Sequence, residues 1–508
     1  MNDEAGATVS LWHATSKVPA FEPLRSDTHA EVCIVGGGIA GVSTAYELAR
    51  RGRDVVLLDD GEIGGGATGR TTAHLATGLD DRYYALARLH GEDGARLAAQ
   101  SHAAAIDFIE EASARHAIAC SFQRVPGYLV AAPGRPASEL SDECIAARDA
   151  GLDASLVDEA GVAAKAVGTA LRFPQQAQVH PLRYLYGLAA ACVREGVRIH
   201  TRTHADAVVG GSGAHVGCGN LRVSCDAIVV ATNTPVNDRV AIHTKQAPYR
   251  TYVIAMPIAP DAFKPCLLWE TGDPYHYVRC WRDDGGDTWL IVGGEDHKTG
   301  QPGEPVDRFA RLRAWTRDHL GIDGAIGHAW SGQVQEPHDG LGFIGRNPSD
   351  EDNVFVATGD SGNGMTHGTL AALLIADLIE GRGSPWEALY SPSRQMVRAA
   401  SDYLRENANV AVQYGDLVTG GDVDDVEAIA IGSGAIIRRG TSKHAVYRDG
   451  AGTLHAHSAI CPHLGCVVQW NGIEKTWDCP CHGSRFRAED GRVIMGPANH
   501  PLAPASVE

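Results

Sequence analysis

Apolar residues along the first sixty positions follow a pattern that predicts two strands with a helix between them. The run Val32-Cys33-Ile34-Val35 leads into the glycine-rich segment 36–41. Apolar residues then recur at helical spacing, and this pattern ends at Gly52; they are Val42, Ala45, Leu48 and Ala49. A second apolar run, residues 55–58, is closed by Asp59. The order is therefore strand, glycine turn, helix, strand and acid.

The glycines of this turn are spaced as a dinucleotide-binding site requires. Gly36 permits a tight turn, Gly38 lets a pyrophosphate approach the backbone, and Gly41 lets the helix pack closely on the strand. Free N–H groups at the helix N-terminus attract phosphate, and Asp59 is placed to bind a ribose hydroxyl. The alternative is a glycine-rich turn without function. The candidate contacts are Gly36, Gly38, Ile39, Ala40, Gly41, Asp59 and Asp60.

A second strand and glycine turn lie far downstream. The apolar run 354–358 enters a turn at residues 359–365, and a long helical pattern follows through Leu370, Leu373, Leu374 and Leu378. The positive end of that helix dipole would stabilise a flavin pyrimidine, which gains negative charge on reduction. The candidate contacts in this turn are Gly359, Asp360, Gly362, Asn363, Gly364 and Met365.

These segments resemble the D-amino-acid-oxidase-like family of FAD-dependent oxidoreductases over about residues 28–390. The resemblance also rests on Gly66-Ala67-Thr68-Gly69-Arg70 and on the strand pattern of residues 228–233. It implies that FAD is bound and that an amine or amino acid is oxidised at a carbon–nitrogen bond as a hydride passes to FAD N5. The further FAD contacts it implies are Gly69, Arg70, Thr71, Thr72, Ala73, His74, Ala231 and Thr232.

The same resemblance implies an α/β FAD-binding domain, Rossmann-like and doubly wound, interleaved with an α+β substrate domain. The alternating apolar pattern of residues 240–300 is typical of strands in the substrate domain. The FAD-binding parts are expected at about 28–80, 180–235 and 325–390, and the substrate parts at about 81–179 and 240–324. Residues 391–424 are expected to form a connector. In it, Ser391-Pro392-Ser393 caps a helical pattern that runs through Val397, Ala400, Leu404 and Ala411.

The C-terminal segment carries two pairs of metal-ligating residues. Cys461 and His463 form a Cys-x-His pair, and Cys479 and His482 form a Cys-x-x-His pair. Two thiolates and two imidazoles are the ligands of a Rieske 2Fe–2S cluster, and a tetrahedral zinc site is the alternative. Short β-type runs from residue 426 onwards predict that the motif lies in a small all-β domain, 425–508.

Both ligand pairs, together with Gly483-Ser484, resemble Rieske proteins, and Cys466 and Cys481, one on each loop, point to those of respiratory cytochrome complexes. That resemblance implies a disulfide between Cys466 and Cys481, the alternative being two reduced, packed thiols. Ser484 matches a serine that donates to a cluster sulfide, whereas Phe486 stands where a tyrosine would donate. Because a missing donor lowers the potential of such a centre, we expect a potential below that of the respiratory proteins.

Composition narrows the function classes. The chain has 508 residues and a net charge of −18, and this charge argues against nucleic-acid binding. Residues 425–508 carry as many acids as bases, so the whole charge lies in the first 424 residues. We find no secretory signal pattern and no apolar run long enough to span a membrane. A cytoplasmic protein is therefore expected.

The source of electrons follows from the motifs that are present. The segments Gly211–Gly213 and Gly432–Gly434 lack a third glycine and a following helical pattern, so no NAD(P)H site is predicted. Electrons should then enter from a small organic substrate. In flavoproteins that resemble dimethylglycine dehydrogenase, a histidine four residues after the matching glycine attaches FAD. His74 lies five residues after Gly69, so we expect non-covalent FAD.

Substrate contacts are expected on strands of the substrate domain. The first candidates are Arg250, Tyr252, Tyr277 and His338, and the further ones are Tyr275, His276, Arg279 and Asp339. An arginine there would bind a substrate carboxylate with two hydrogen bonds. The alternative is that these are strand residues which pair with solvent or neighbouring acids. His367 follows the second glycine turn and is a candidate to lie near the isoalloxazine, the alternative being a packing residue in the first turn of the helix.

Three functional hypotheses remain open from the sequence. In the first, FAD takes a hydride from an amine or amino acid and the cluster relays single electrons to an external acceptor. In the second, the same domains run in reverse as a reductase fed through the cluster. In the third, the enzyme is an oxygen-using oxidase, and its Rieske domain is a non-catalytic redox sensor or docking module. The first is favoured, because a high-potential cluster draws electrons outward from a flavin.

Overall fold

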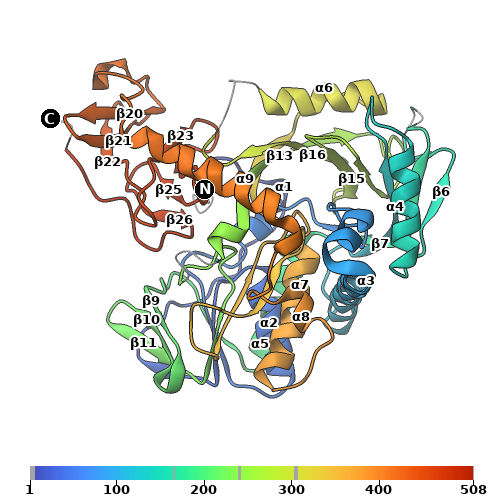
Figure 1. Ribbon diagram of the computed structural model, residues 1–508, viewed down its shortest axis with the longest axis horizontal. Helices are drawn as coiled ribbons and strands as arrows, with labels where there is room; N and C mark the ends of the chain where they lie inside the picture. Colours follow the sequence, from blue (N-terminus) through green and yellow to red (C-terminus); the bar gives the residue numbers. More distant parts are fainter. Residues whose placement is uncertain (1–5, 164, 166, 238–241, 302–306, 507–508) are drawn as a thin grey trace.

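The computed structural model describes residues 6–163, 165, 167–237, 242–301 and 307–506 (Figure 1). A mostly parallel sheet lies at the centre of the first part of the chain, in the order β18-β19-β12-β2-β3-β8. Its strands are β2 Val32–Val35, β3 Val55–Leu58, β8 Arg198–His200, β12 Ala227–Val230, β18 Phe343–Arg346 and β19 Val354–Thr358. Strands β2, β3 and β12 are buried at every position, as expected for parallel strands covered on both faces.

Three helices pack against this sheet or one another: α2 Ile39–Arg50, α5 Pro181–Arg194 and α7 Gly364–Ile379. Helices α2 and α7 approach closely, because a Cβ atom on Gly368 would lie 2.6 Å from Ile39 Cγ2. Both helices begin directly after strands of the sheet, so their N-termini lie at its carboxyl edge. The strand, glycine turn and helix predicted at residues 32–50 are present, and this part is the doubly wound α/β domain that the sequence predicts.

A large sheet forms the second layer, in the order β17-β13-β16-β15-β14-β5-β7-β4, with β6 paired to β7. Its strands are β4 His74–Leu75, β5 Gln123–Val130, β6 Ser155–Val157, β7 Ala170–Gln178, β13 Gln246–Ile258, β14 Leu267–Glu270, β15 His276–Arg282, β16 Thr288–Lys298 and β17 His328–Pro337. Strand β17 was expected in the FAD-binding part, but it belongs to this sheet because it pairs with β13 from Gln246–Pro337 to Ala255–His328.

The two faces of β13 have different neighbours. Tyr252, Ile254 and Met256 pack with α6 (Arg308–Leu320) in one apolar cluster, whereas Val253 and Ala255 belong to the main core. The remaining helices of the first part are α1 Leu11–Ala14, α3 Tyr83–Arg115, α4 Ser138–Asp149 and α8 Glu387–Tyr390. A small outlying sheet contains β1 Thr28–His29, β9 Ala207–Val209, β10 His215–Cys218 and β11 Leu221–Ser224.

The C-terminal domain consists of two small antiparallel sheets, in the orders β20-β21-β22 and β23-β24-β25-β26. The strands are β20 Ser433–Arg439, β21 Ser442–Arg448, β22 Leu454–Ser458, β23 Gln469–Asn471, β24 Thr476–Asp478, β25 Arg485–Arg487 and β26 Val493–Met495. Its core contains Trp477, Phe486 and four cysteines from the two ligand loops. Figure 1 shows this domain, in red, against the first part of the chain.

The connector differs from the expected helix. Helix α9 begins at Ala400, not near Ser393, and ends at Gln413. Leu404 on its predicted apolar face is 66% exposed. Polar contacts set its orientation instead, because Asn409 faces Gln301 and the Asn407 amide donates to the Thr244 carbonyl (2.9 Å). After the helix, Tyr414 Oη donates to the Leu464 carbonyl (2.7 Å), so the connector packs on the first cluster loop.

Short 3-10 turns complete the fold: η1 Ala67–Arg70, η2 Gly211–Gly213, η3 His243–Lys245, η4 Val397–Ala399, η5 Tyr414–Leu417 and η6 Val426–Ala428. Turn η1 has a fixed position because the Trp330 indole donates to the Arg70 carbonyl (2.9 Å) and the Ser10 hydroxyl donates to the Gly69 carbonyl (2.6 Å). This turn and the two helix N-termini define one side of the site described next.

Candidate active site and iron-sulfur centre

A cavity of about 320 Å³ opens between the parallel sheet, the large sheet and the C-terminal domain. The first turns of α2 and α7 both line it, and neither helix has a side-chain cap at its Ncap residue. Two helix N-termini therefore present backbone N–H groups and positive dipole ends to the same space. This arrangement suits a ligand that carries a phosphate at one end and a developing negative charge at the other.

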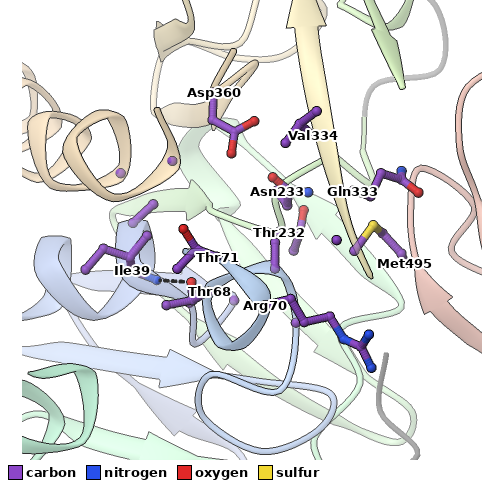
Figure 2. Close-up of a pocket in the computed structure, with 18 of the residues that line it drawn as sticks. Ile39, Thr68, Arg70, Thr71, Thr232, Asn233, Gln333, Val334, Asp360 and Met495 are labelled. Atoms are coloured by element: carbon purple, nitrogen blue, oxygen red, sulfur yellow. Dashed lines mark hydrogen bonds between the residues drawn. The ribbon is translucent and has the colours of Figure 1, made fainter. Parts of the chain in front are cut away.

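The glycine turn has the geometry that its sequence predicts. Gly36 has φ +111°, a conformation that L side chains rarely adopt. A Cβ atom on Gly41 would lie 1.8 Å from the Gly36 carbonyl oxygen, so the helix can approach the strand only without a side chain there. Ile39 N–H donates to Thr68 Oγ1 (3.0 Å), which ties the helix to turn η1 (Figure 2).

Most of the predicted cofactor residues lie on the cavity wall: Gly36, Gly38, Ile39, Ala40, Asp59, Asp60, Arg70, Thr71, Thr72, His74, Ala231, Thr232, Asp360, Gly362, Asn363, Gly364 and Met365. Four do not line it: Gly41, Gly69, Ala73 and Gly359. Gly41 and Gly69 are packing positions, since a Cβ atom on Gly69 would lie 2.3 Å from the His13 ring. The residues that line the cavity fit FAD, because the first turns of α2 and α7 and the glycine cradle offer the backbone donors that a dinucleotide uses.

The guanidinium of Arg70 does not make the cofactor contact that its motif suggests. Arg70 lines the cavity, but Figure 2 shows its guanidinium pointing away from the other labelled side chains. Nη1 donates to Glu474 Oε1 (3.0 Å) and to the Ser331 carbonyl (2.9 Å). The charge of Arg70 therefore holds the C-terminal domain, and it is not directed at a cofactor phosphate.

The imidazole of His74 is engaged on both sides. Nδ1 lies 3.1 Å from Thr72 Oγ1, and Nε2 lies 3.4 Å from the Val278 carbonyl. Burial, reinforced by the nearby Arg279 guanidinium, lowers the pKa of His74 to about 3. The ring is thus a neutral wall residue that is fixed by its neighbours.

Because both nitrogens of His74 have partners in the protein, we predict that FAD is held without a covalent bond. Precipitation of the holoenzyme with acid should leave the yellow flavin in the supernatant. The measurement is the flavin absorbance of the supernatant and of the washed pellet. Colour retained in the pellet after denaturation contradicts the prediction.

The wall formed by the large sheet is acidic. Asp80, Asp296, Tyr275 and Tyr277 line the cavity there, and Tyr275 Oη donates to Asp80 Oδ2 (3.2 Å). Burial raises the pKa of Asp80 above its usual value, and it raises the pKa of Asp296 to about 7. The Asp296 Oδ1 atom is buried and makes no hydrogen bond with any residue that the structure describes. Neither Asp80 nor Asp296 was among the candidates from the sequence. Asp296 could have been noticed, because it is an acid that closely follows the apolar strand pattern of residues 290–292.

Tyr277 is the one of the four first-choice substrate candidates that lies on the described wall of the cavity. Its hydroxyl is 2.7 Å from Thr251 Oγ1, which also lines the cavity. Arg250 and Tyr252 flank Thr251 on β13 and face the opposite side of the sheet, since side chains alternate along a strand. Tyr252 Oη contacts His297 Nε2 (2.9 Å).

Arg250 lies in the interface with the C-terminal domain, where its Nη1 donates to Ser331 Oγ (2.6 Å) and its Nη2 is 3.7 Å from Asp478 Oδ2. At this position Arg250 does not reach the cavity, so it cannot bind a substrate carboxylate there as the sequence suggested. His338 lies away from the cavity as well, and its Nε2 contacts the Thr244 carbonyl (3.2 Å).

Of the further candidates, two line the described cavity wall and three lie elsewhere. Tyr275 and His367 line the cavity. His276 faces α6 and stacks on Trp315 with ring centroids 4.5 Å apart. Arg279 lies over the Trp12 ring at 5.0 Å and donates to the Val179 carbonyl (2.9 Å). Asp339 pairs with Arg394 (2.7 Å).

The two cluster loops bring the predicted metal ligands together. The imidazoles of His463 and His482 lie with ring centroids 5.0 Å apart, and the buried thiols of Cys461 and Cys479 are close enough for each to shift the pKa of the other. Burial is the main cause that lowers the pKa of His482 to about 3, so its ring is neutral, as a ligand must be. His482 Nδ1 is buried and has no hydrogen-bond partner among the described residues.

Two thiols and two imidazoles on facing loops fit a Rieske cluster. Cys466 and Cys481 are joined by a disulfide that links the two loops, with their Cα atoms 6.5 Å apart. The sulfur atoms of Cys466, Cys479 and Cys481 gather within 4.8 Å, but the disulfide leaves Cys479 as the available ligand of the three.

The cluster loops face the first part of the chain. His243, which is 3% exposed, packs its ring against His463 at 5.0 Å and against His482 at 6.1 Å. Gln333 lines the cavity, and its Nε2 donates to the Gly483 carbonyl (3.0 Å). A Cβ atom on Gly483 would lie 2.5 Å from Pro248 Cβ. Gln333 therefore lies between the cavity and the second cluster loop.

Comparison with known proteins agrees with this geometry. The model of the FAD dependent oxidoreductase family matches residues 31–378, which is more than half of the chain. This chain belongs to the FAD-dependent oxidoreductase family. The model of the Rieske [2Fe-2S] domain matches residues 421–506. The protein is thus an FAD-dependent oxidoreductase with a C-terminal Rieske domain, as the sequence predicts, and FAD and a 2Fe–2S cluster are its cofactors.

Individual relatives of this oxidoreductase support the assignment of its FAD-dependent part and of its Rieske domain. YhfW of Bacillus subtilis (strain 168), which is named as a Rieske 2Fe-2S iron-sulfur protein, is 33% identical over 504 residues, covering 98% of this chain and 97% of YhfW. The gamma-glutamylputrescine oxidoreductase of Escherichia coli (strain K12) is 25% identical over 393 residues, covering 75% of this chain and 91% of that enzyme.

Among solved structures, glycine oxidase from Geobacillus kaustophilus has a similar fold, with a TM-score of 0.59 and 21% identity. It covers 72% of this oxidoreductase and 99% of its own chain. In the part of the chain that the structure describes, we find no helix with the length and apolar character needed to cross a membrane.

Proposed function

We propose that the enzyme oxidises an amine or amino-acid-type substrate by hydride transfer to FAD and relays the electrons singly through the Rieske cluster to an external acceptor. FAD supplies a two-electron acceptor and the cluster a one-electron carrier. The side chains of the protein bind and orient the substrate amine, take its proton and exclude water. The observation that carries the proposal is the position of Gln333, which touches the acidic cavity on one side and a cluster loop on the other.

The acidic wall supports an amine as the group that is recognised. A buried carboxylate attracts a cationic amine strongly, because little water screens the two charges. Hydride loss requires the neutral amine, so the ammonium must give up a proton before it reacts. Asp296 can accept that proton near neutral pH, since its pKa is about 7.

Arginine positions favour an amine over a substrate that must be held by its carboxylate. Arg250 and Arg279 point away from the described cavity wall, and the Arg70 guanidinium is bound to Glu474. An amino acid would therefore find no arginine clamp on the wall formed by the large sheet. The Escherichia coli relative, named for a gamma-glutamyl amine, supports the same substrate class.

The relay is favoured over the other two hypotheses by the way the domains meet. A module that only sensed redox state would not need its ligand loop packed on the cavity wall. The reverse direction remains the second candidate, since the same contacts would serve it. Covalent linkage of the two centres makes their electron exchange intramolecular, with a high effective concentration.

An anaerobic panel tests the substrate class. The holoenzyme is mixed with primary amines, N-methyl amines, acylated diamines and α-amino acids, and bleaching of the flavin absorbance is followed. We expect bleaching with at least one amine that lacks an α-carboxylate. Bleaching by α-amino acids alone would contradict the proposal.

The Asp296→Asn variant tests the role of the acidic wall. Because a charge-assisted hydrogen bond contributes about 1.5–3 kcal/mol, the variant should bind the amine roughly 10–100-fold more weakly. In the parent enzyme the carboxyl becomes charged as the pH rises through about 7, so amine binding should tighten over that range. The variant should lose this step.

The measurement is the dependence of KM and of the flavin reduction rate on pH, between about pH 6 and 8. Asp287→Asn, on the exposed turn between β15 and β16, is the matched control and should behave like the parent. A pH step retained in Asp296→Asn assigns it to another group and removes Asp296 from the substrate site.

A further inference from the structure

The C-terminal domain forms part of the wall of the flavin cavity. The residues that it contributes belong to β26 and its neighbours: Arg492, Val493, Ile494, Met495, Gly496, Ala498 and Asn499. Figure 2 shows Met495 beside Gln333 and Val334 on one side of the cavity. The cavity is therefore closed by a segment that follows the cluster motif in the sequence, far from the FAD-binding motifs.

This segment, residues 492–499, is attached to the part of the wall where the parallel sheet ends. Asn499 Nδ2 donates to the Ala205 carbonyl (2.9 Å), and His204 Nε2 lies 3.2 Å from the Asn499 carbonyl. A Cβ atom on Gly496 would lie 3.2 Å from Val236 Cγ1. Ala205 and Val236 follow strands β8 and β12 at their carboxyl ends, where open α/β sheets bind dinucleotides.

Arg492 brings a positive charge to this wall. Its Nε atom is buried and makes no hydrogen bond within the described residues. The nearby acid Asp490 is bound by Arg487 (2.9 Å). The other arginine on the described wall, Arg70, is bound to Glu474. Arg492 is thus the guanidinium on this wall that is available to an anionic ligand, and its planar group is well suited to phosphate.

We propose that the Rieske domain completes the FAD site: residues 492–499 cover the adenylate half of the cofactor, and Arg492 binds its phosphate. The Rieske domain then has two roles, as electron carrier and as the outer wall of the flavin site. This assignment is independent of the substrate, because it concerns the end of the cavity that holds the glycine turn.

Binding of ADP to the apoprotein tests the proposal directly. Full-length apoprotein is produced under riboflavin limitation, and ADP and FAD are titrated separately by calorimetry. Arg492→Ala should raise the Kd of both ligands roughly 10–100-fold, since a charged hydrogen bond to phosphate is lost. The signal of the cluster in electron paramagnetic resonance reports whether the Rieske domain is intact.

Arg439→Ala is the matched control, because this arginine lies on the same domain, pairs with Asp425 and does not line the cavity. It should bind ADP like the parent. Arg492→Gln, which keeps most of the side-chain volume, decides the matter if the alanine variant loses its cluster. An unchanged Kd for ADP in a cluster-bearing Arg492 variant would overturn the proposal, as would an equal loss in Arg439→Ala.

Discussion

Replacement of one cluster ligand, Cys479→Ser, is expected to reduce turnover with cytochrome c as electron acceptor at least about 100-fold. Residues that merely support metal ligands cost 10–100-fold when they are changed, so loss of a ligand should cost more. Reduction of the flavin by substrate should continue, because Cys479 does not line the described cavity wall. Cytochrome c is a suitable probe because a protein of that size cannot enter a cavity of about 320 Å³.

Two rates are measured for this variant: anaerobic bleaching of the flavin and reduction of cytochrome c. Cys218→Ser, in β10 of the outlying sheet, is the matched control and should keep both. If Cys479→Ser lost its cluster but still reduced cytochrome c at the parent rate, electrons would leave directly from the flavin. The relay would then be excluded.

The second large effect is expected from Glu474→Gln, which breaks a buried ion pair between the two parts of the chain. The Glu474 side chain is 0% exposed and that of Arg70 is 5% exposed, with their charged atoms 3.0 Å apart. Thr8 and Ser331 also donate to this carboxylate. Removing one partner of a buried pair leaves an uncompensated charge and typically costs about 3–5 kcal/mol. The variant should therefore hold the Rieske domain much more weakly.

Urea unfolding of this variant is followed separately by flavin fluorescence and by circular dichroism of the cluster. Both signals should change at lower urea concentrations than in the parent, and flavin-to-cluster transfer should slow. Glu489→Gln, an exposed acid of the same domain, is the control and should leave all of these unchanged. A midpoint within experimental error of the parent would show that Glu474 does not hold the interface.

The same pair predicts sensitivity to acid. Burial acts to raise the pKa of Glu474, but Arg70, Arg250 and Arg485 outweigh it and hold that pKa below its usual value of 4.5. A carboxyl with a lowered pKa stabilises the folded state above the ordinary range, and this contribution is lost as the pH falls through the lowered value. Unfolding experiments below about pH 4.5 should show this loss in the parent and not in Glu474→Gln.

Local motifs made the cofactor sites predictable from the sequence. The glycine turns, Asp59 and the four cluster ligands act through short segments, so their spacing alone indicates the chemistry. Among the substrate candidates, Tyr277 lies on the cavity wall. Arg250 and Tyr252 do not, because a shift of one residue along a strand moves a side chain to the other face. Nothing in the β13 pattern showed that Thr251 faces the cavity.

Contacts between distant parts of the chain could not be predicted from the sequence. Arg70 and Glu474 are 404 positions apart, and neither has a local partner that would signal the pair. Arg70 stands within an apparent FAD motif, which suggested a cofactor contact. The role of residues 492–499 in the cavity likewise depends on how the domains dock, which no periodic pattern records.

Anaerobic stopped-flow mixing of holoenzyme with a reducing amine tests the central claim most directly. The flavin absorbance should fall first, and the cluster signal should change afterwards at a rate that does not depend on enzyme concentration, because both centres belong to one chain. A cluster that stays oxidised while the flavin is fully bleached would contradict this account. So would a cluster that is reduced faster at higher enzyme concentration.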